Sequence, residues 1–319
     1  MKHTQEPGRG LPYHQLHRGG RTGPLRALLG VFALLVLTLL VANLVLEGLF
    51  ALGYLIAGDD VSAAMHRLID TTHLTPAALA FLNLSLAAAI PVAMAVTWVV
   101  HGLRPAWLAS VRPRIRWRWF ATCLALAVLA LIATLIVSAV LPSQGPSDAK
   151  VGGSVNHWSS TMRDYLLVIL LLTPLQAAGE EYAFRGYLTQ AFGGIFRSAW
   201  AAVLFPAVLF ALAHGAQDVP VFFDRLAFGL VAGVLVVVTG GLEAGIAMHV
   251  LNNFVAFGLA LVYGDIGATL NASSGSWWAI PVTLTQSLVF LALVLPMARR
   301  RGLATRTTRP DFVGAGRSV

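Results

Sequence analysis

Residues 165–192 read YLLVILLLTPLQAAGEEYAFRGYLTQAF, an apolar run that contains three charged side chains, Glu180, Glu181 and Arg185. A helix crosses the hydrocarbon core of a bilayer with about 20 apolar residues, so this run is long enough to span a membrane. An ionisable side chain at the centre of a bilayer costs about 3 kcal/mol or more. Three such side chains so close together therefore indicate a functional site inside a membrane helix.

The composition extends this interpretation to the whole chain. Of 319 residues, 57% are hydrophobic and 11% are charged, whereas soluble domains carry about 25% charged residues. These values exclude an ordinary soluble domain and a disordered chain. Eight apolar segments do not alternate between polar and apolar residues as the strands of a membrane barrel do, so we expect them to be helices. They are 27–57, 77–100, 119–141, 165–192, 197–215, 221–240, 242–264 and 277–298. We expect an all-α fold, a polytopic transmembrane helix bundle of about eight spans within residues 27–298. The fifth and sixth segments are short or closely spaced, and one of them could be partly re-entrant.

The positive charges are placed unequally along the chain. Residues 1–26, the loop at 101–118, Arg197 and residues 299–319 together hold 17 of the 22 Lys and Arg, and the alternate loops hold four. The positive-inside rule predicts that both termini are cytoplasmic, as a disordered basic tail over 1–26 and a basic tail over 299–319. The net charge is +8, and most of the Lys and Arg residues that carry it lie next to apolar segments. This position indicates contact with the lipid bilayer and no nucleic-acid partner. We expect an integral protein of a bacterial cell membrane.

Three further polar side chains lie within apolar segments. His214 ends the fifth segment, and His249 and Asn253 lie one helical turn apart on the seventh, so that they can point to the same place. Counted at 1.5 Å per residue from the cytoplasmic ends of their helices, Glu180, His214 and Asn253 lie roughly 18–21 Å deep, and His249 roughly 12 Å. The helices therefore place these groups in one layer of the bundle.

Two adjacent carboxylates have different expected directions. Glu181 and Arg185 are four residues apart and can pair, whereas Glu180 is rotated by about 100°, so the two carboxylates should not face the same point. We expect Glu180 within about 3–6 Å of His214, in a cavity closed by the two residues of the seventh segment and open toward the cytoplasmic half. Taken singly, each group also has a structural explanation, as an ion pair or as an interhelical hydrogen bond.

The order of these residues resembles a known family. Three motifs on successive apolar segments carry the resemblance, namely Glu180-Glu181-x-x-x-Arg185, Phe210-x-x-x-His214 and His249-x-x-x-Asn253. They are similar to the motifs of the CAAX protease and bacteriocin-processing (CPBP) family of intramembrane proteases, also called Abi proteins. The similarity covers about residues 165–260, which would form a CPBP-like core.

The resemblance implies a membrane-embedded peptidase. In such a site Glu180 and His214 would activate a water, His249 and Asn253 would hold the oxyanion, and the remaining two motif residues, Glu181 and Arg185, would complete the first motif. Eukaryotic members cleave prenylated CAAX tails, but most bacterial members have no prenylated substrate, so this specificity is not carried over. Some members act in bacteriocin processing or self-immunity, and some are inactive scaffolds.

The same groups can hydrolyse a peptide bond on chemical grounds alone. Hydrolysis needs a base for water, a proton for the leaving amine and donors for an oxyanion. No Ser or Cys lies in an activating motif. We therefore expect a hydrolase, an intramembrane endopeptidase that uses Glu/His-activated water on membrane-associated peptides or proteins and needs no cofactor. Three alternatives remain open. They are a zinc protease with Glu180, His214 and His249 as ligands, a proton-coupled transporter, and a non-enzymatic membrane scaffold or immunity protein. No HExxH motif supports zinc, and no inverted repeat supports a transporter.

Overall fold

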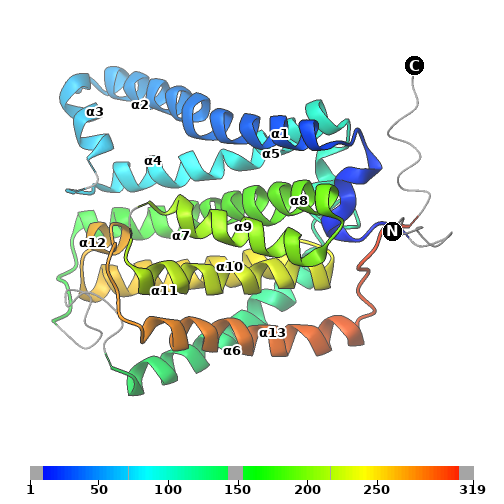
Figure 1. The fold of residues 1–319 in the computed structure, drawn as a ribbon. Helices are drawn as coiled ribbons and strands as arrows, with labels where there is room; N and C mark the ends of the chain where they lie inside the picture. Colours follow the sequence, from blue (N-terminus) through cyan, green and yellow to red (C-terminus); the bar gives the residue numbers. More distant parts are fainter. Residues whose placement is uncertain (1–9, 71, 143–153, 216, 309–319) are drawn as a thin grey trace.

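The computed structural model describes residues 10–70, 72–142, 154–215 and 217–308 (Figure 1). Over these residues the chain is helical between its loops and forms no strand, only two isolated β-bridges. The expected all-α fold is confirmed. The elements are η1 (Tyr13–Gly19), α1 (Pro24–Val36), η2 (Leu37–Ala42), α2 (Asn43–Ala57), α3 (Val61–Ile69), α4 (Pro76–Ala87), α5 (Ala89–His101), η3 (Pro105–Leu108), α6 (Trp117–Val140), α7 (Ser160–Glu180), η4 (Glu181–Leu188), α8 (Thr189–Phe196), α9 (Ala199–Ala213), α10 (Val219–Thr239), α11 (Glu243–Tyr263), α12 (Ile266–Leu270) and α13 (Ala279–Arg300).

Seven helical segments of the described chain are long and apolar enough to cross a membrane. They are Pro24–Ala57, Pro76–His101, Trp117–Val140, Ser160–Phe196, Val219–Thr239, Glu243–Tyr263 and Ala279–Arg300, and they coincide with seven of the eight predicted segments. The remaining segment is α9, an apolar helix of 15 residues. It measures about 22 Å, against a hydrocarbon core of about 30 Å. The prediction of a polytopic bundle is confirmed, and the fifth segment is the short one.

The helices α7 and α11 lie next to each other inside the bundle (Figure 1). On one side α7 packs against α4, and on the other side α11 packs against α6 and α10. The contact of α7 with α4 is close because Gly179 lies on it, where an added Cβ would come within 2.2 Å of the Leu86 carbonyl oxygen. Gly229 and Gly233 of α10 likewise lie against Ala207 and Val203 of α9. Small residues at these positions let the backbones approach closely, as is typical of membrane helices.

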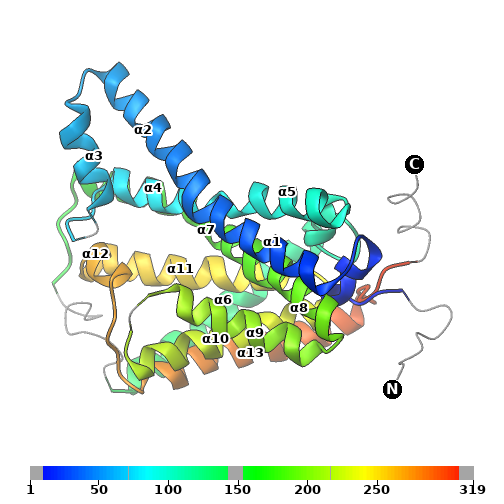
Figure 2. The same cartoon turned by 45° about the horizontal axis from the view of Figure 1, so that its top comes forward.

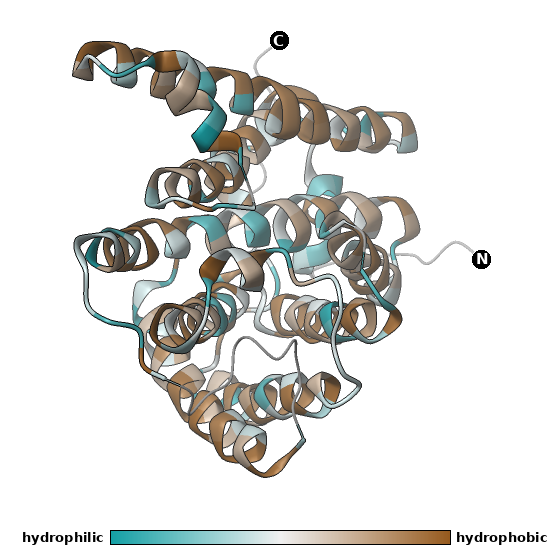
Figure 3. Ribbon diagram, turned by 90° about the vertical axis from the view of Figure 1, so that its left-hand side faces the viewer, coloured by the Kyte–Doolittle hydropathy of each residue, from teal (hydrophilic) through white to brown (hydrophobic). Residues whose placement is uncertain are grey.

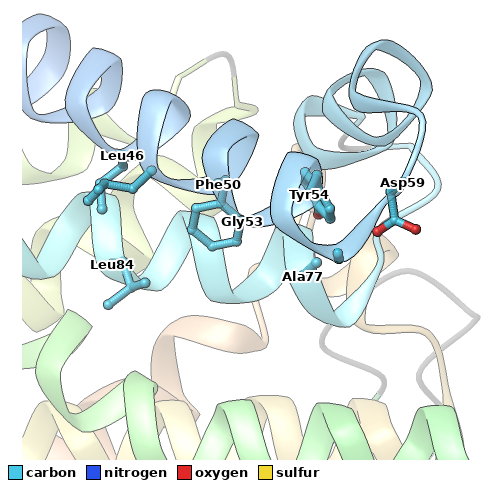
Figure 4. A pocket seen from close by; sticks show the side chains of 9 residues that line it. Leu46, Phe50, Gly53, Tyr54, Asp59, Ala77 and Leu84 are labelled. Atoms are coloured by element: carbon cyan, nitrogen blue, oxygen red, sulfur yellow. The ribbon is translucent and has the colours of Figure 1, made fainter.

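The first hairpin departs from the rest of the bundle. In Figure 2, α2 diverges from α4 toward its far end, and none of the residues of α2 is buried. A cavity of about 540 Å³ separates the two helices, with Leu46, Phe50 and Tyr54 on the α2 side and Leu84 on the α4 side (Figure 4). In Figure 3, brown marks hydrophobic residues, and it covers most of the helical ribbon. Outward-facing apolar side chains such as those of α2 are what a bilayer solvates.

The structure corrects the expected disorder of the N-terminal tail for residues 10–26 only. Residues 1–9 lie outside the described chain, but Tyr13 and Leu16 of η1 are fully buried. The Tyr13 hydroxyl donates to the Leu108 carbonyl at 2.5 Å, and Pro12 forms an antiparallel bridge with Arg306. These side chains fill the end of the bundle. Their partners are distant in sequence, so the polar composition of the N-terminal segment does not reveal the contact. Both described chain ends therefore lie at the same end of the bundle (Figure 1).

This placement predicts the topology of the chain. Asp59, after α2, and Arg301, after α13, are both exposed, and they lie at opposite ends of the membrane segments. With the termini in the cytoplasm, a membrane-impermeant maleimide should label Asp59→Cys in intact cells and Arg301→Cys only after permeabilisation. The native Cys123 is fully buried and serves as the unlabelled background. Labelling of Arg301→Cys in intact cells would contradict the predicted orientation.

Candidate active site

The first motif lies where the long helix of the fourth segment changes its geometry. The α-helix α7 ends at Glu180, and residues Glu181–Leu188 continue it as a π-helix, η4. A π-turn widens the helix and alters the directions of successive side chains, and such turns occur frequently at functional sites. Glu181 and Arg185 both lie on η4 and are buried, so two of the three charged residues of the motif occupy this widened turn, and Glu180 directly precedes it.

Glu181 is the centre of a buried network. Its Oε1 atom lies 2.9 Å from Arg185 Nη1 and 2.9 Å from His249 Nδ1 on α11. The side chains of Glu181 and Arg185 are at most 1% exposed. The expected Glu181–Arg185 ion pair is therefore present. Because the opposite charges of Glu181 and Arg185 compensate each other, both ionised groups can lie in a low-dielectric interior.

Two neighbouring features hold this network in place. The Arg185 guanidinium carbon lies 4.1 Å from the ring centroid of Phe210, where the face of the ring attracts a cation. On the other side, an added Cβ on Gly245 would come within 2.6 Å of Glu181 Oε2. Only glycine at this position lets the carboxylate reach across to α11.

Glu180 contacts the same histidine from its other side. Its Oε2 atom lies 3.3 Å from His249 Nε2, and its side chain is 13% exposed, against 0% for Glu181. The two carboxylates thus do not face one point, but they share one partner ring, which the sequence analysis did not expect. The histidine ring has two nitrogens, and each carboxylate contacts a different one, Glu180 at Nε2 and Glu181 at Nδ1. The ring can donate to both carboxylates only when it is protonated.

His214 is oriented by the backbone of its own helix. Its Nδ1 lies 2.8 Å from the Phe210 carbonyl oxygen, which can only accept, so Nδ1 carries the proton and Nε2 is the acceptor of the neutral ring. Among the described residues, Glu180 pairs with His249 and makes no direct hydrogen bond to His214. His214 still belongs to the same cluster, because the Phe210 ring contacts both histidine rings, with centroids 4.7 Å and 6.0 Å away.

Asn253 is held by a residue that the sequence analysis missed. Its amide nitrogen donates to Gln176 Oε1 at 2.9 Å. Gln176 is one α-helical turn before Glu180 on α7, and this spacing was the available signal for its position on the same face of the helix. Asn252 also donates to Asn253 Oδ1, at 3.3 Å. One N–H of the Asn253 amide remains for another acceptor.

The exposed part of the site faces the loop between α9 and α10. His214 follows the last residue of α9 and is exposed, and the other end of α9 joins α8 near the end of the bundle that carries the termini (Figure 1). The expected cavity that opens toward the end with the termini stays a prediction.

A second, apolar space lies beside the site. This cavity of about 690 Å³ is bordered by Ala178 and Tyr182, which flank the two glutamates on the fourth segment, and by Val250 next to His249 on α11. Trp117 and Phe120 of α6 form its opposite wall. The polar cluster and a hydrophobic cavity therefore share the same two helices.

The donor set gives little support for a metal centre. Within the described chain, no group of three or more His, Cys, Asp or Glu side chains is arranged to hold a metal ion. Both nitrogens of His249 face carboxylates, and His214 Nδ1 faces a carbonyl oxygen. A zinc ion would need these ligand atoms to converge on one point.

Comparisons with known proteins agree with the motifs. Residues 162–255 match the family model described as type II CAAX prenyl endopeptidase Rce1-like. The resemblance to the CPBP family is confirmed. The matched family is one of proteases, and together with the seven apolar helices the match supports an integral membrane protein. The matched segment contains all six predicted site residues.

A curated relative covers a longer stretch. The uncharacterized protein YyaK of Bacillus subtilis is 27% identical over 193 residues, which is 57% of this chain. The match spans 62% of the length of YyaK. No solved structure matches the chain.

The buried network predicts a stability effect. Replacing Arg185 by Ala leaves Glu181 buried without its counter-ion, which costs about 3–5 kcal/mol. We expect Arg185→Ala to lower the melting temperature in detergent and the yield of folded protein. The matched control is Arg163→Ala, which removes an exposed ion pair with Asp164 at 2.8 Å and should cost about 1 kcal/mol or less. Equal melting of Arg185→Ala and the wild type would show that the pair does not support the fold.

Proposed function

We propose that the chain is an intramembrane endopeptidase that hydrolyses peptide bonds of membrane-associated substrates with a water activated by Glu180 and His214. The observation that carries this proposal is the pair of adjacent glutamates on the two edges of His249, one buried and one partly exposed. Two carboxylates in different surroundings can take different roles, one in chemistry and one in structure. The protease-family match over the same residues supports the proposal.

In the proposed mechanism, Glu180 accepts a proton from the attacking water, because its carboxylate is the accessible one of the pair. His214 has Nε2 as the acceptor of its neutral ring, so it can orient this water or pass the proton to the leaving amine. No covalent acyl-enzyme is formed. These two residues lie on different helices, so the bundle must be intact for them to cooperate.

Oxyanion stabilisation is assigned to α11. The Nε2–H of His249 would turn from Glu180 to the developing oxyanion, while Glu181 holds the opposite nitrogen. The second N–H of Asn253, not used by Gln176, would donate to the same oxygen. Removal of one such donor typically lowers kcat by about 100- to 1,000-fold. Glu181, Arg185 and Gln176 then act as positioning residues.

The substrate class follows from the surroundings of the site. The apolar cavity beside the polar cluster suits an apolar segment or a lipid-modified end of a peptide. We place the enzyme in a bacterial cell membrane with both termini in the cytoplasm, on the basis of the distribution of Lys and Arg. We also propose that it needs no cofactor. A zinc protease, a proton-coupled transporter and a catalytically inactive scaffold are the rival functions that the experiment below separates.

The test uses the purified full chain in nanodiscs with a panel of membrane-anchored peptides, some of which carry a prenylated CAAX end. Glu180→Gln removes the base without changing the side-chain size, and we expect it to lower cleavage by about 100-fold or more. The control is Glu47→Gln on α2, a helix without buried residues, which should cleave at the wild-type rate. Mass spectrometry of the products gives the cleavage site and the rate.

Three results would count against the proposal. Cleavage that survives Glu180→Gln unchanged would remove Glu180 from the mechanism. Loss of cleavage with a strong chelator, restored by zinc alone, would favour the zinc protease. Absence of any cleavage across the panel, together with wild-type folding, would favour the scaffold or the transporter.

A further inference from the structure

A second group of ionisable side chains lies at the end of the bundle that carries the termini. Here η1 packs against α8, and a cavity of about 300 Å³ opens between them and the start of α1. Arg18 and Arg197 line this cavity, as do His17 and His101. None of these residues belongs to the proposed active site.

The cavity carries positive charge without a counter-ion. Among the described residues that line it there is no Asp or Glu. Arg18 Nη1 donates only weakly to the Gly194 carbonyl, at 3.4 Å. Burial and the neighbouring Arg197 both lower the pKa of Arg18 from its ordinary value. Two guanidinium groups that repel each other around an open space favour the binding of an anion.

His17 adds an unsatisfied polar group. Its side chain is 3% exposed, and neither ring nitrogen has a hydrogen-bond partner among the described residues. The ring stacks on His101 with centroids 3.9 Å apart. A buried polar group without a partner is unfavourable, and such a group commonly marks a position that a ligand satisfies.

The start of α1 adds a third favourable element. Pro24 is the first residue of α1, Gly23 is its N-cap, and no side chain caps the helix. Thr22, Gly23 and Pro24 all line the cavity. The positive end of the helix dipole attracts anions.

We propose that this cavity binds the phosphate group of an anionic ligand. Arginine binds phosphate through two parallel hydrogen bonds, and this preference explains two arginines at one cavity. Directly after the cavity, α1 exposes Leu25, Leu28 and Phe32, which places the phosphate position at the level where the helix enters the bilayer. The phosphate can belong to a phospholipid, with its acyl chains along α1, or to a soluble phosphate compound. The proposal is independent of the peptidase activity.

The experiment measures thermal melting of the full chain in an uncharged detergent. One arm adds inorganic phosphate, a second adds dihexanoyl phosphatidylglycerol below its micelle concentration, and a third adds sodium chloride at matched ionic strength. We expect phosphate or the phospholipid to raise the melting temperature by roughly 3 °C or more near saturation, and chloride to have no such effect. A shift with phosphate assigns a soluble ligand, and a shift with the phospholipid alone assigns a lipid headgroup.

Variants connect the shift to the cavity. The double variant Arg18→Gln/Arg197→Gln should abolish the shift in melting temperature. Without ligand, this variant should melt no lower than the wild type, because the repulsion between the two guanidinium groups is removed. The control Arg112→Gln/Arg114→Gln makes the same charge change at two exposed arginines of the 101–118 loop and should keep the shift. His17→Phe preserves the stacked ring, removes both nitrogens and should weaken the shift. No shift with either ligand, or an equal shift in the Arg18/Arg197 variant, would overturn the proposal.

Discussion

The buried contact of Glu181 with Arg185 and His249 is the constraint on which the centre of this protein depends. A buried ionised group needs a partner of opposite charge, and Glu181 and Arg185 provide this partner for each other. Gly245 leaves room for the carboxylate, and the Phe210 ring covers the guanidinium. The contact also joins the fourth segment to α11, which are the two helices that carry most of the polar groups.

The same contact separates the roles of the two glutamates. Glu181 has no exposure and holds His249 by one nitrogen, whereas Glu180 is partly exposed and faces the other nitrogen. A histidine fixed at one edge is pre-organised at its second edge, which is the property that an oxyanion donor or proton carrier needs. The His249 ring thus takes part both in the buried network and in the proposed chemistry.

Hydropathy and local spacing predicted the features that depend on a single helix. They gave the membrane segments, the pairing of Glu181 with Arg185 four residues later, and the motif positions. They failed where two distant helices meet. The pairing of Glu180 with His249 depends on the approach of α11 and on the second nitrogen of one ring, and the role of Gln176 depends on its contact with Asn253.

Two other tertiary contacts were equally hidden in the sequence. Tyr13 and Leu16 are buried although the residues around them are polar. Arg116, which the charge distribution counts only as a loop cation, forms a 2.7 Å ion pair with the fully buried Glu243 at the start of α11. A local pattern cannot show which distant partner will satisfy a side chain, because that partner is chosen by the packed fold.

The central claim is that Glu181 supports the fold and Glu180 supports the chemistry. The most direct measurement compares the melting temperatures of Glu180→Gln and Glu181→Gln in the same detergent, and it needs no substrate. Each substitution removes one charge from one edge of His249. The account predicts a clear fall for Glu181→Gln, which leaves Arg185 buried without its counter-ion, and nearly wild-type melting for Glu180→Gln. Equal falls, or a larger fall for Glu180→Gln, would contradict this division of roles.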